Sequence, residues 1–148
     1  MGKKLWIGIL VLVFCLSMTT VFAAKKAEPQ PAPAPVELDA QVAGSISKVF
    51  GFSVDTDTIT GLRLKNYTYG EVAYVYSLAV LSKKTSKDII QLRDSRMSWA
   101  EVAAKLNASP DKGQQWVSQI MKEAKMEKET EKLKEILASE PKPGKPKK

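Results

Sequence analysis

Apolar residues recur at helical spacing through the middle of the chain. In the first part of this region they stand three or four positions apart at Leu38, Val42, Ile46 and Val49, and Phe50 follows directly, four positions after Ile46. This spacing places all five side chains on one face of a helix. The pattern therefore predicts an amphipathic helix that packs this face against a core.

A second pattern is an internal repeat with a period of 30 residues. Residues 62–73 (LRLKNYTYGEVA) align without a gap to residues 92–103 (LRDSRMSWAEVA). Five aligned positions are identical, among them Arg63/Arg93, and four more are chemically similar. Similarity at a fixed spacing indicates that one structural unit has been duplicated.

Each copy of the repeat contains the signature of a helix start. Thr68 and Ser98 stand three residues before Glu71 and Glu101, which is the spacing of a capping box. In this motif the hydroxyl accepts a hydrogen bond from the glutamate N–H, and the carboxylate accepts one from the N–H of the capping residue. Both copies are therefore predicted to begin a helix at the same place. This capping role accounts for both glutamates, so their repeated positions are no evidence of a pair of catalytic carboxylates.

A shorter helix is predicted before each capping box, with Asp55 and Thr85 at matching positions as its caps. Each copy is then a short helix, a tight turn and a longer helix. In the first copy only Glu71 and Ser77 interrupt the apolar character of residues 69–81. We expect this segment to be the central buried helix.

The last predicted helix begins at Ser109, with Pro110 in its first turn. Beyond Met126 the chain is rich in Glu and Lys, and we expect it to extend this helix with little tertiary support. The predicted fold is all-α, a compact small bundle of about six helices built on two helix-turn-helix-like repeats. Two copies are too few for a solenoid, so they should close on each other and on the outer helices.

The composition of the two ends differs from that of the middle. Residues 1–23 have Lys3 and Lys4 before an apolar run and end in small residues, which predicts a cleaved secretory signal peptide. The alternative is an uncleaved membrane anchor formed by residues 5–24. Residues 24–36 are predicted to be a disordered Pro-rich linker, 37–126 the helical repeat domain, and 127–148 a charged helical extension with a disordered basic tail.

The residue types in the chain exclude several kinds of chemistry. It has 148 residues, a net charge of +7, no histidine, and a single cysteine, Cys15, inside the predicted signal peptide. Ser-His-Asp and Cys-His nucleophile systems and the usual His/Cys zinc sites therefore cannot form in the mature chain. We expect a non-enzyme without catalytic, metal or cofactor sites.

The repeat supplies the candidate interaction residues, which are Arg63, Tyr67, Tyr69, Arg93 and Trp99. An arginine beside an aromatic ring can stack on it or bind an anion, and exposed tyrosines are common in protein interfaces. The alternative, which we favour for the two arginines, is that they brace the repeat.

The second copy, MSWAEVAAKLNAS in residues 97–109, resembles the helix-turn-helix consensus of DNA-binding proteins. The resemblance concerns the fold, and predicted export would separate the chain from genomic DNA. The repeat as a whole also resembles small exported bacterial proteins with Leu-Arg and Gly-Glu-Val-Ala repeats. That resemblance implies a fold and a localisation, and it implies no activity.

Two functions are compatible with these features. The first is an exported, periplasmic or secreted, non-catalytic helical module that binds a protein or another envelope partner. The second is binding to a polyanion such as a cell-wall polymer, an anionic lipid or nucleic acid, through the basic tail residues Lys142, Lys145, Lys147 and Lys148. A membrane association is expected only if the N-terminal segment is uncleaved.

Overall fold

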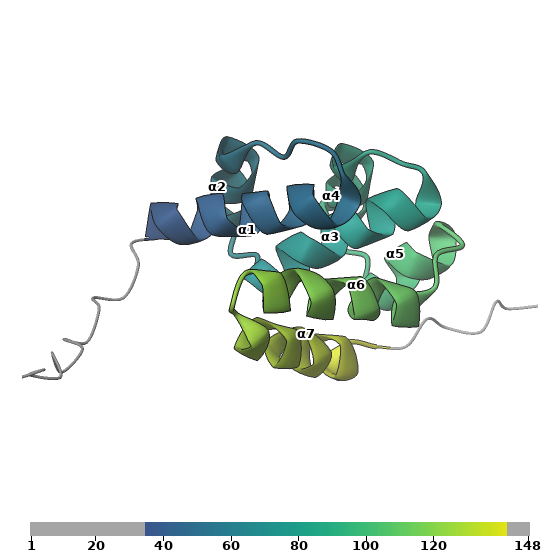
Figure 1. Cartoon of the computed structure of the whole chain (residues 1–148). Coiled ribbons are helices and arrows are strands. Elements are labelled where there is room, and N and C mark those ends of the chain that lie inside the picture. Colours follow the sequence, from purple (N-terminus) through teal and green to yellow (C-terminus); the bar gives the residue numbers. More distant parts are fainter. Residues whose placement is uncertain (1–34, 142–148) are drawn as a thin grey trace, which may run out of the picture. The chain divides into compact units, whose positions relative to one another are not determined.

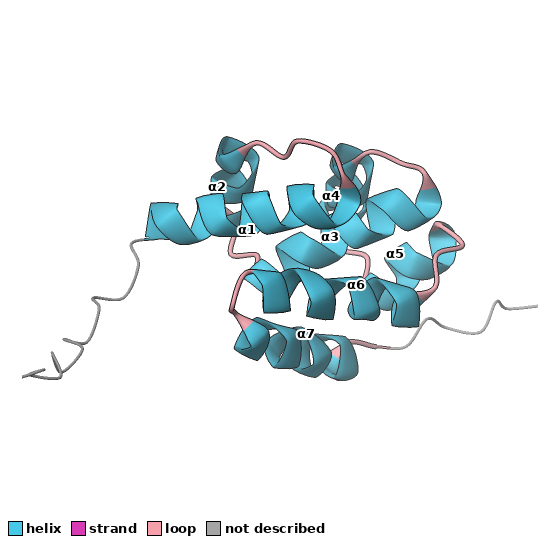
Figure 2. Cartoon of the chain, viewed as in Figure 1, coloured by secondary structure: helices cyan, strands magenta, loops and turns pink. Residues whose placement is uncertain are grey.

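The computed structural model describes residues 35–141, which form seven helices and no strand within that range (Figures 1 and 2). The predicted all-α fold is confirmed. The predictions for the signal peptide, most of the Pro-rich linker and the basic tail concern residues outside this range. None of the described helices combines the length and apolar character needed to cross a bilayer.

The helices are α1 (Pro35–Phe50), α2 (Thr56–Leu64), α3 (Tyr69–Ser82), α4 (Ser86–Asp94), α5 (Trp99–Lys105), α6 (Pro110–Glu123) and α7 (Glu127–Ser139). The first begins with Pro35, inside the expected linker, because proline is well suited to the first turn of a helix. The repeat comprises α2 with α3 and α4 with α5.

Both predicted capping boxes are present. The hydroxyl of Thr68 accepts a hydrogen bond from the N–H of Glu71 at 3.2 Å, and that of Ser98 accepts one from Glu101 at 3.3 Å. Each glutamate in turn accepts a hydrogen bond from the backbone N–H of its capping residue. Thr85 and Asp88 form a third box at the start of α4. The starts of these helices are thus determined locally.

The second copy differs from the expected short helix followed by a longer one. Its second helix, α5, has 7 residues, whereas α4 before it has 9. The chain turns at Asn107, where φ is 50°, and Ser109 then caps α6. Pro110 stands at the first position of α6 and, without an N–H, could not continue α5. The prediction of a longer helix is therefore right for α3 and wrong for α5.

The turns between helices follow one design. Five of them contain a left-handed residue other than glycine, namely Asn66, Lys83, Arg96, Asn107 and Lys125. After α2 the N–H of Tyr67 donates to the carbonyl of Leu62, and after α6 the N–H of Met126 donates to the carbonyl of Met121. These bonds satisfy carbonyl groups at the helix end, as in a Schellman motif. The next helix then starts within three residues.

Helix α3 lies at the centre of the core, as predicted, and contacts α1, α2, α4, α6 and α7. Its residues from Tyr69 to Ala79 are all buried. The ring of Trp99 enters the core from α5 and is fully buried, 5.3 Å from the ring of Tyr74 in an edge-on arrangement. The aromatic rings of α3 and α5 therefore join the two copies of the repeat.

Residues 127–139 do not extend α6, contrary to the prediction, but form the separate helix α7, which packs on α6 and α3. Leu133 of α7 is almost fully buried. The helices approach so closely that a Cβ atom on Gly70 would lie 2.5 Å from the carbonyl oxygen of Glu129. The compact part of the chain therefore includes α7, which the sequence had suggested lies outside the domain.

Candidate functional site

The five predicted interaction residues do not form an exposed surface. Trp99 is fully buried, and Tyr67 and Tyr69 are only 7% and 6% exposed. Arg63 and Arg93 are half-buried. The prediction of a contact surface made by these residues is therefore corrected: burial of the large rings stabilises the joint between the two copies, which leaves little of them for a partner.

The two repeat arginines share two contacts, one with a backbone carbonyl and one with an aromatic ring. The Arg63 guanidinium donates to the carbonyl of Tyr67 and lies 4.2 Å from the centroid of the Tyr69 ring. Arg93 donates to the carbonyl of Met97 at 2.8 Å and lies 4.8 Å from the ring of Trp99. Each arginine thus fixes the turn that follows its own helix, which is the bracing role.

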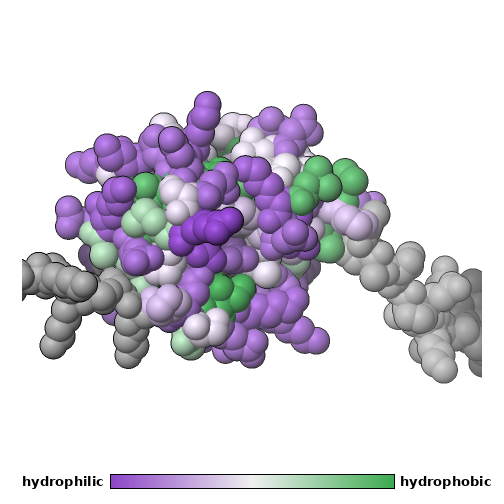
Figure 3. Space-filling model, turned by 180° about the vertical axis from the view of Figure 1, so that it is seen from behind, coloured by the Kyte–Doolittle hydropathy of each residue, from purple (hydrophilic) through white to green (hydrophobic). Residues whose placement is uncertain are grey.

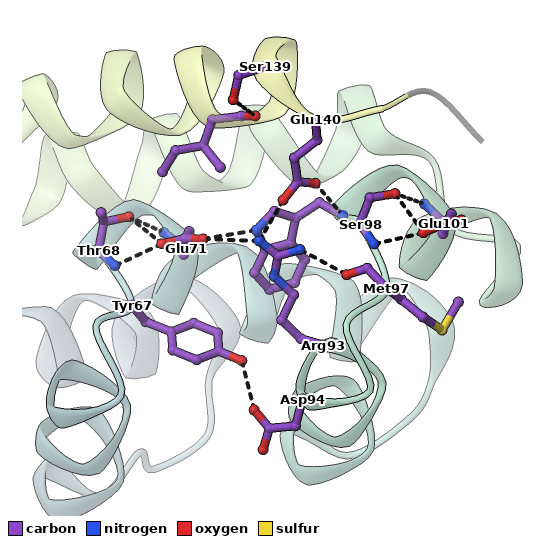
Figure 4. A network of polar contacts seen from close by, with 12 residues as sticks. Tyr67, Thr68, Glu71, Arg93, Asp94, Met97, Ser98, Glu101, Ser139 and Glu140 are labelled. Carbon is purple, nitrogen blue, oxygen red and sulfur yellow. Dashed lines mark hydrogen bonds and ion pairs between the residues drawn. The ribbon is translucent and has the colours of Figure 1, made fainter. Parts of the chain in front are cut away.

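Glu71 has more partners than its counterpart in the second copy. One carboxylate oxygen accepts hydrogen bonds from Thr68, and the other accepts one from the indole N–H of Trp99 at 3.1 Å. The latter oxygen also lies 3.8 Å from the guanidinium of Arg93. Figure 4 shows Glu71 and Arg93 pointing toward each other between the two copies. A single buried carboxylate therefore caps α3 and connects it to α4 and α5.

Glu140, directly after α7, completes this polar network. Its carboxylate forms an ion pair with Arg93 at 2.5 Å and accepts a hydrogen bond from the backbone N–H of Trp99 at 2.5 Å. That N–H belongs to the first turn of α5 and has no partner within its own helix. Figure 4 shows Glu140 reaching down to this point. The carboxylate thus attaches the end of α7 to the second copy of the repeat.

A shallow hollow of about 250 Å³ lies beside this network, lined by Lys65, Asn66, Tyr67, Glu71 and Arg93. Lys65 forms an ion pair with Asp94 at 2.8 Å, and the Tyr67 hydroxyl donates weakly to the same carboxylate at 3.4 Å. The charged side chains that line the hollow are thus already paired within the protein. The hollow therefore offers little attraction to an anionic ligand.

A second buried carboxylate, Asp39, connects the first three helices. It accepts hydrogen bonds from the hydroxyls of Tyr69 at 2.8 Å and Thr60 at 2.7 Å. In residues 35–141 every buried side-chain nitrogen and oxygen atom has a hydrogen-bond partner. No group of His, Cys, Asp and Glu side chains in this range is arranged to hold a metal ion. The interior polar groups of this range are therefore all engaged in hydrogen bonds within the protein.

Burial raises the pKa of Tyr67 to about 12, with a further contribution from the negative charge of Asp94. Burial also raises the pKa of Tyr74 to about 12. The pKa of Glu101, the carboxylate of the α5 capping box, shifts in the opposite direction. It is lowered by the hydrogen bonds that the carboxylate accepts from the backbone N–H and the hydroxyl of Ser98.

The raised tyrosine pKa values predict a loss of stability at alkaline pH. An unfolded tyrosine loses its proton near pH 10, whereas folded Tyr67 and Tyr74 keep theirs up to a pKa of about 12. The folded state therefore holds more protons in this window, and the free energy of unfolding should fall as pH rises through it. We expect a loss of roughly 3 kcal/mol, less than the full shifts imply because solvent screens the Tyr67 hydroxyl.

Urea unfolding followed by tryptophan fluorescence at about pH 8 and about pH 11.5 measures this loss. Lysine deprotonation acts in the same range, so Tyr74→Phe is the control, and its alkaline loss should be about half as large. An equal loss in both proteins would contradict the assignment to Tyr74.

The structure reveals an aromatic cluster that the sequence analysis did not single out, here called the aromatic edge: exposed Phe52, partly exposed Phe50 and Trp116, and buried Tyr76 beneath them. The rings of Phe50 and Phe52 are parallel at 5.8 Å, and Phe50 meets Trp116 edge-on at 5.0 Å. Phe52 also lies 6.5 Å from Tyr76 and is 41% exposed. In the sequence, Phe50 and Phe52 stand on either side of Gly51 at the end of the first predicted helix, and this pair could have indicated the cluster.

The rest of the described surface is strongly polar and balanced in charge. Residues 35–141 contain 15 basic and 15 acidic side chains, so the net charge of the chain comes from the two terminal segments. Figure 3 shows the face opposite to that of Figure 1, where hydrophilic residues dominate and hydrophobic ones form small, separate areas. The described domain therefore has no net positive charge that would attract a nucleic acid.

Comparisons with protein-family models, with curated proteins and with solved structures gave no match to this chain.

Proposed function

We propose that the chain is an exported, non-catalytic helical module that binds a protein partner through its aromatic edge. The observation that carries this proposal is the exposure of Phe52, whose ring packs against those of Phe50 and Tyr76, with Trp116 packed in turn on Phe50. Aromatic side chains are enriched at the centres of protein interfaces because they bury much area with few rotatable bonds.

The remaining surface features support the same choice. The other exposed large apolar side chains of the described residues are the aliphatic Val36, at the start of α1, and Leu64, at the end of α2. The charged groups around the repeat arginines are paired with one another. Within the described residues, the aromatic edge is thus the surface best suited to a packed interface.

Export is proposed from the first 23 residues alone. Cell fractionation with intact-mass analysis tests it, and we expect a periplasmic or extracellular chain that begins at Ala24. A cytosolic chain of full length would contradict export. A full-length chain in the membrane fraction would replace secretion by anchoring through residues 5–24.

Replacing Phe52 with serine should weaken partner binding about tenfold or more, since aromatic anchors of interfaces commonly contribute this much. The fold should persist, because the side chain is 41% exposed. Crosslinking in intact cells, followed by affinity measurements with the identified partner, gives the readout. The matched control is Leu64→Ser, which removes a more exposed apolar side chain, 81% exposed, at the end of α2. Equal binding by Phe52→Ser and the native chain would exclude the aromatic edge.

The alternative function, polyanion binding, is favoured by one observation. Because residues 35–141 are balanced in charge, the basic excess includes the four tail lysines at positions 142, 145, 147 and 148. Binding of this kind should weaken steeply with salt and fail when residues 142–148 are deleted. A partner that is insensitive to salt and still binds the shortened chain would exclude it.

A further inference from the structure

The link between α6 and α7 has less local support than the other turns. Residues 123–127 read EAKME and contain strong helix formers, with no Gly, Pro or Asn. Lys125 nevertheless adopts a left-handed conformation, with φ of 52°. Met126, the capping residue of α7, makes no side-chain hydrogen bond to the helix, whereas α2 to α6 all have a capping side chain. Local preferences therefore favour a continuous helix over residues 110–139, about 45 Å long.

Contacts distant from the link keep α7 folded back. Leu133 is buried, the backbone of Glu129 lies against Gly70, and Glu140 binds Arg93 and the Trp99 N–H. The acceptor surface also includes α6, against which α7 packs together with α3, while Arg93 belongs to α4 and the Trp99 N–H to the first turn of α5. These contacts do not depend on whether α7 is joined to the same chain through Lys125.

We propose that α7 is exchanged between two copies of the chain, so that each copy's α7 and Glu140 dock on α3, Arg93 and Trp99 of the other. In the exchanged dimer α6 and α7 form one continuous helix through Lys125. The polar network around Arg93 is then completed by a carboxylate from the partner copy.

A second copy is the occupant that fits this acceptor surface best. Its α7 is identical to the helix already docked there, so the same close approach at Gly70 and the same ion pair at Arg93 are available. Exchange also releases Lys125 from its left-handed conformation, which is unfavourable for residues other than glycine. Exchange of an identical element is a low-cost route to a dimer, and short hinge loops under strain favour it.

The hinge variant Lys125→Gly tests the proposal. Glycine adopts the left-handed conformation readily and disfavours a continuous helix, so it stabilises the monomer on both counts. The native chain, with the N-terminus found in cells, should form a dimer whose share rises with concentration in light-scattering chromatography. Lys125→Gly should raise the dimer dissociation constant about tenfold or more, since each dimer contains two hinges.

The matched control is Arg96→Gly, at the left-handed position of the α4–α5 turn, where φ is 65°. It relieves the same local strain in a turn that does not open, so the dissociation constant should stay within about twofold of the native value. A chain that remains monomeric up to about millimolar concentration after slow refolding would overturn the proposal. An equal response to the two glycine variants would also overturn it.

The rate of interconversion distinguishes exchange from an ordinary surface dimer, because exchange requires α7 to leave its acceptor first. Leu133→Ser weakens the docking of α7 equally in the closed monomer and in the exchanged dimer. Its dimer dissociation constant should therefore stay close to the native value, whereas an isolated dimer should return to monomer at least about tenfold faster than the native dimer. An isolated dimer that returns to monomer at the same rate in the native chain and in Leu133→Ser would overturn the exchange.

Discussion

Replacing Glu71 with alanine is expected to lower the free energy of unfolding by about 2 to 4 kcal/mol. The substitution removes a helix cap, which contributes about 1 kcal/mol. It also leaves the buried indole N–H of Trp99 without an acceptor, at a cost of about 1 to 3 kcal/mol. Urea denaturation followed by far-UV circular dichroism measures the change, with linear extrapolation to water.

Glu101→Ala is the matched control, because Glu101 occupies the same position in the second copy. Its hydrogen-bond partner is Ser98, and its carboxylate is exposed. We therefore expect Glu101→Ala to lose the cap alone and to destabilise the protein clearly less than Glu71→Ala. Comparable losses in the two variants would mean that the cap dominates and that the bond to Trp99 adds little.

Replacing Gly70 with alanine should destabilise the protein by about 2 kcal/mol, although alanine is normally the better helix former. The added Cβ would lie 2.5 Å from the carbonyl of Glu129 and 3.1 Å from the Cβ of Leu133, so α7 must move away. Hydrogen exchange monitored by mass spectrometry should show lost protection in residues 127–139, with thermal unfolding measured in parallel.

The second copy provides the control for this substitution as well. Ala100 is the counterpart of Gly70 and is partly exposed, which shows that this helical position accepts a Cβ where α7 does not cover it. Ala100→Gly should cost about 0.5 to 1 kcal/mol from backbone entropy alone, with protection of α7 unchanged. Stabilisation by Gly70→Ala would show that α7 can shift freely and would contradict the close packing.

The parts of the fold that sequence reasoning predicted correctly depend on contacts within a few residues. Thr68, Ser98 and Ser109 each cap a helix through a backbone N–H three residues away, so a short segment is enough to locate the start of α3, α5 and α6. The 30-residue repeat then relates α2 and α3 to α4 and α5. The burial of α3 also followed from sequence, because only Glu71 and Ser77 interrupt its apolar run.

The break before α7 could not be predicted, because its cause lies in distant contacts. Lys125 carries no turn signal of the kind that glycine or asparagine gives, and the stretch from 123 to 127 has high helix propensity. What opposes that propensity is the packing of Leu133 and the ion pair of Glu140 with Arg93. Both depend on the folded positions of α3 and α4.

The candidate site was misjudged for a related reason. A tryptophan or tyrosine beside an arginine fits an exposed binding site and a buried brace equally well in sequence. In the structure both rings are buried, since Trp99 and Tyr67 pack against each other between the two copies of the repeat. Phe52 went unnoticed because it stands in a connecting segment, where periodicity gives no information.

The equal numbers of acidic and basic side chains in residues 35–141 have a consequence for handling the protein and for its fate after proteolysis. A fragment trimmed to this range would be close to its isoelectric point at neutral pH. Electrostatic repulsion between such fragments would be minimal, and proteins in that condition tend to precipitate. The lysines of the terminal segments would thus act as a solubilising charge for the whole chain, in addition to any part they play in recognition.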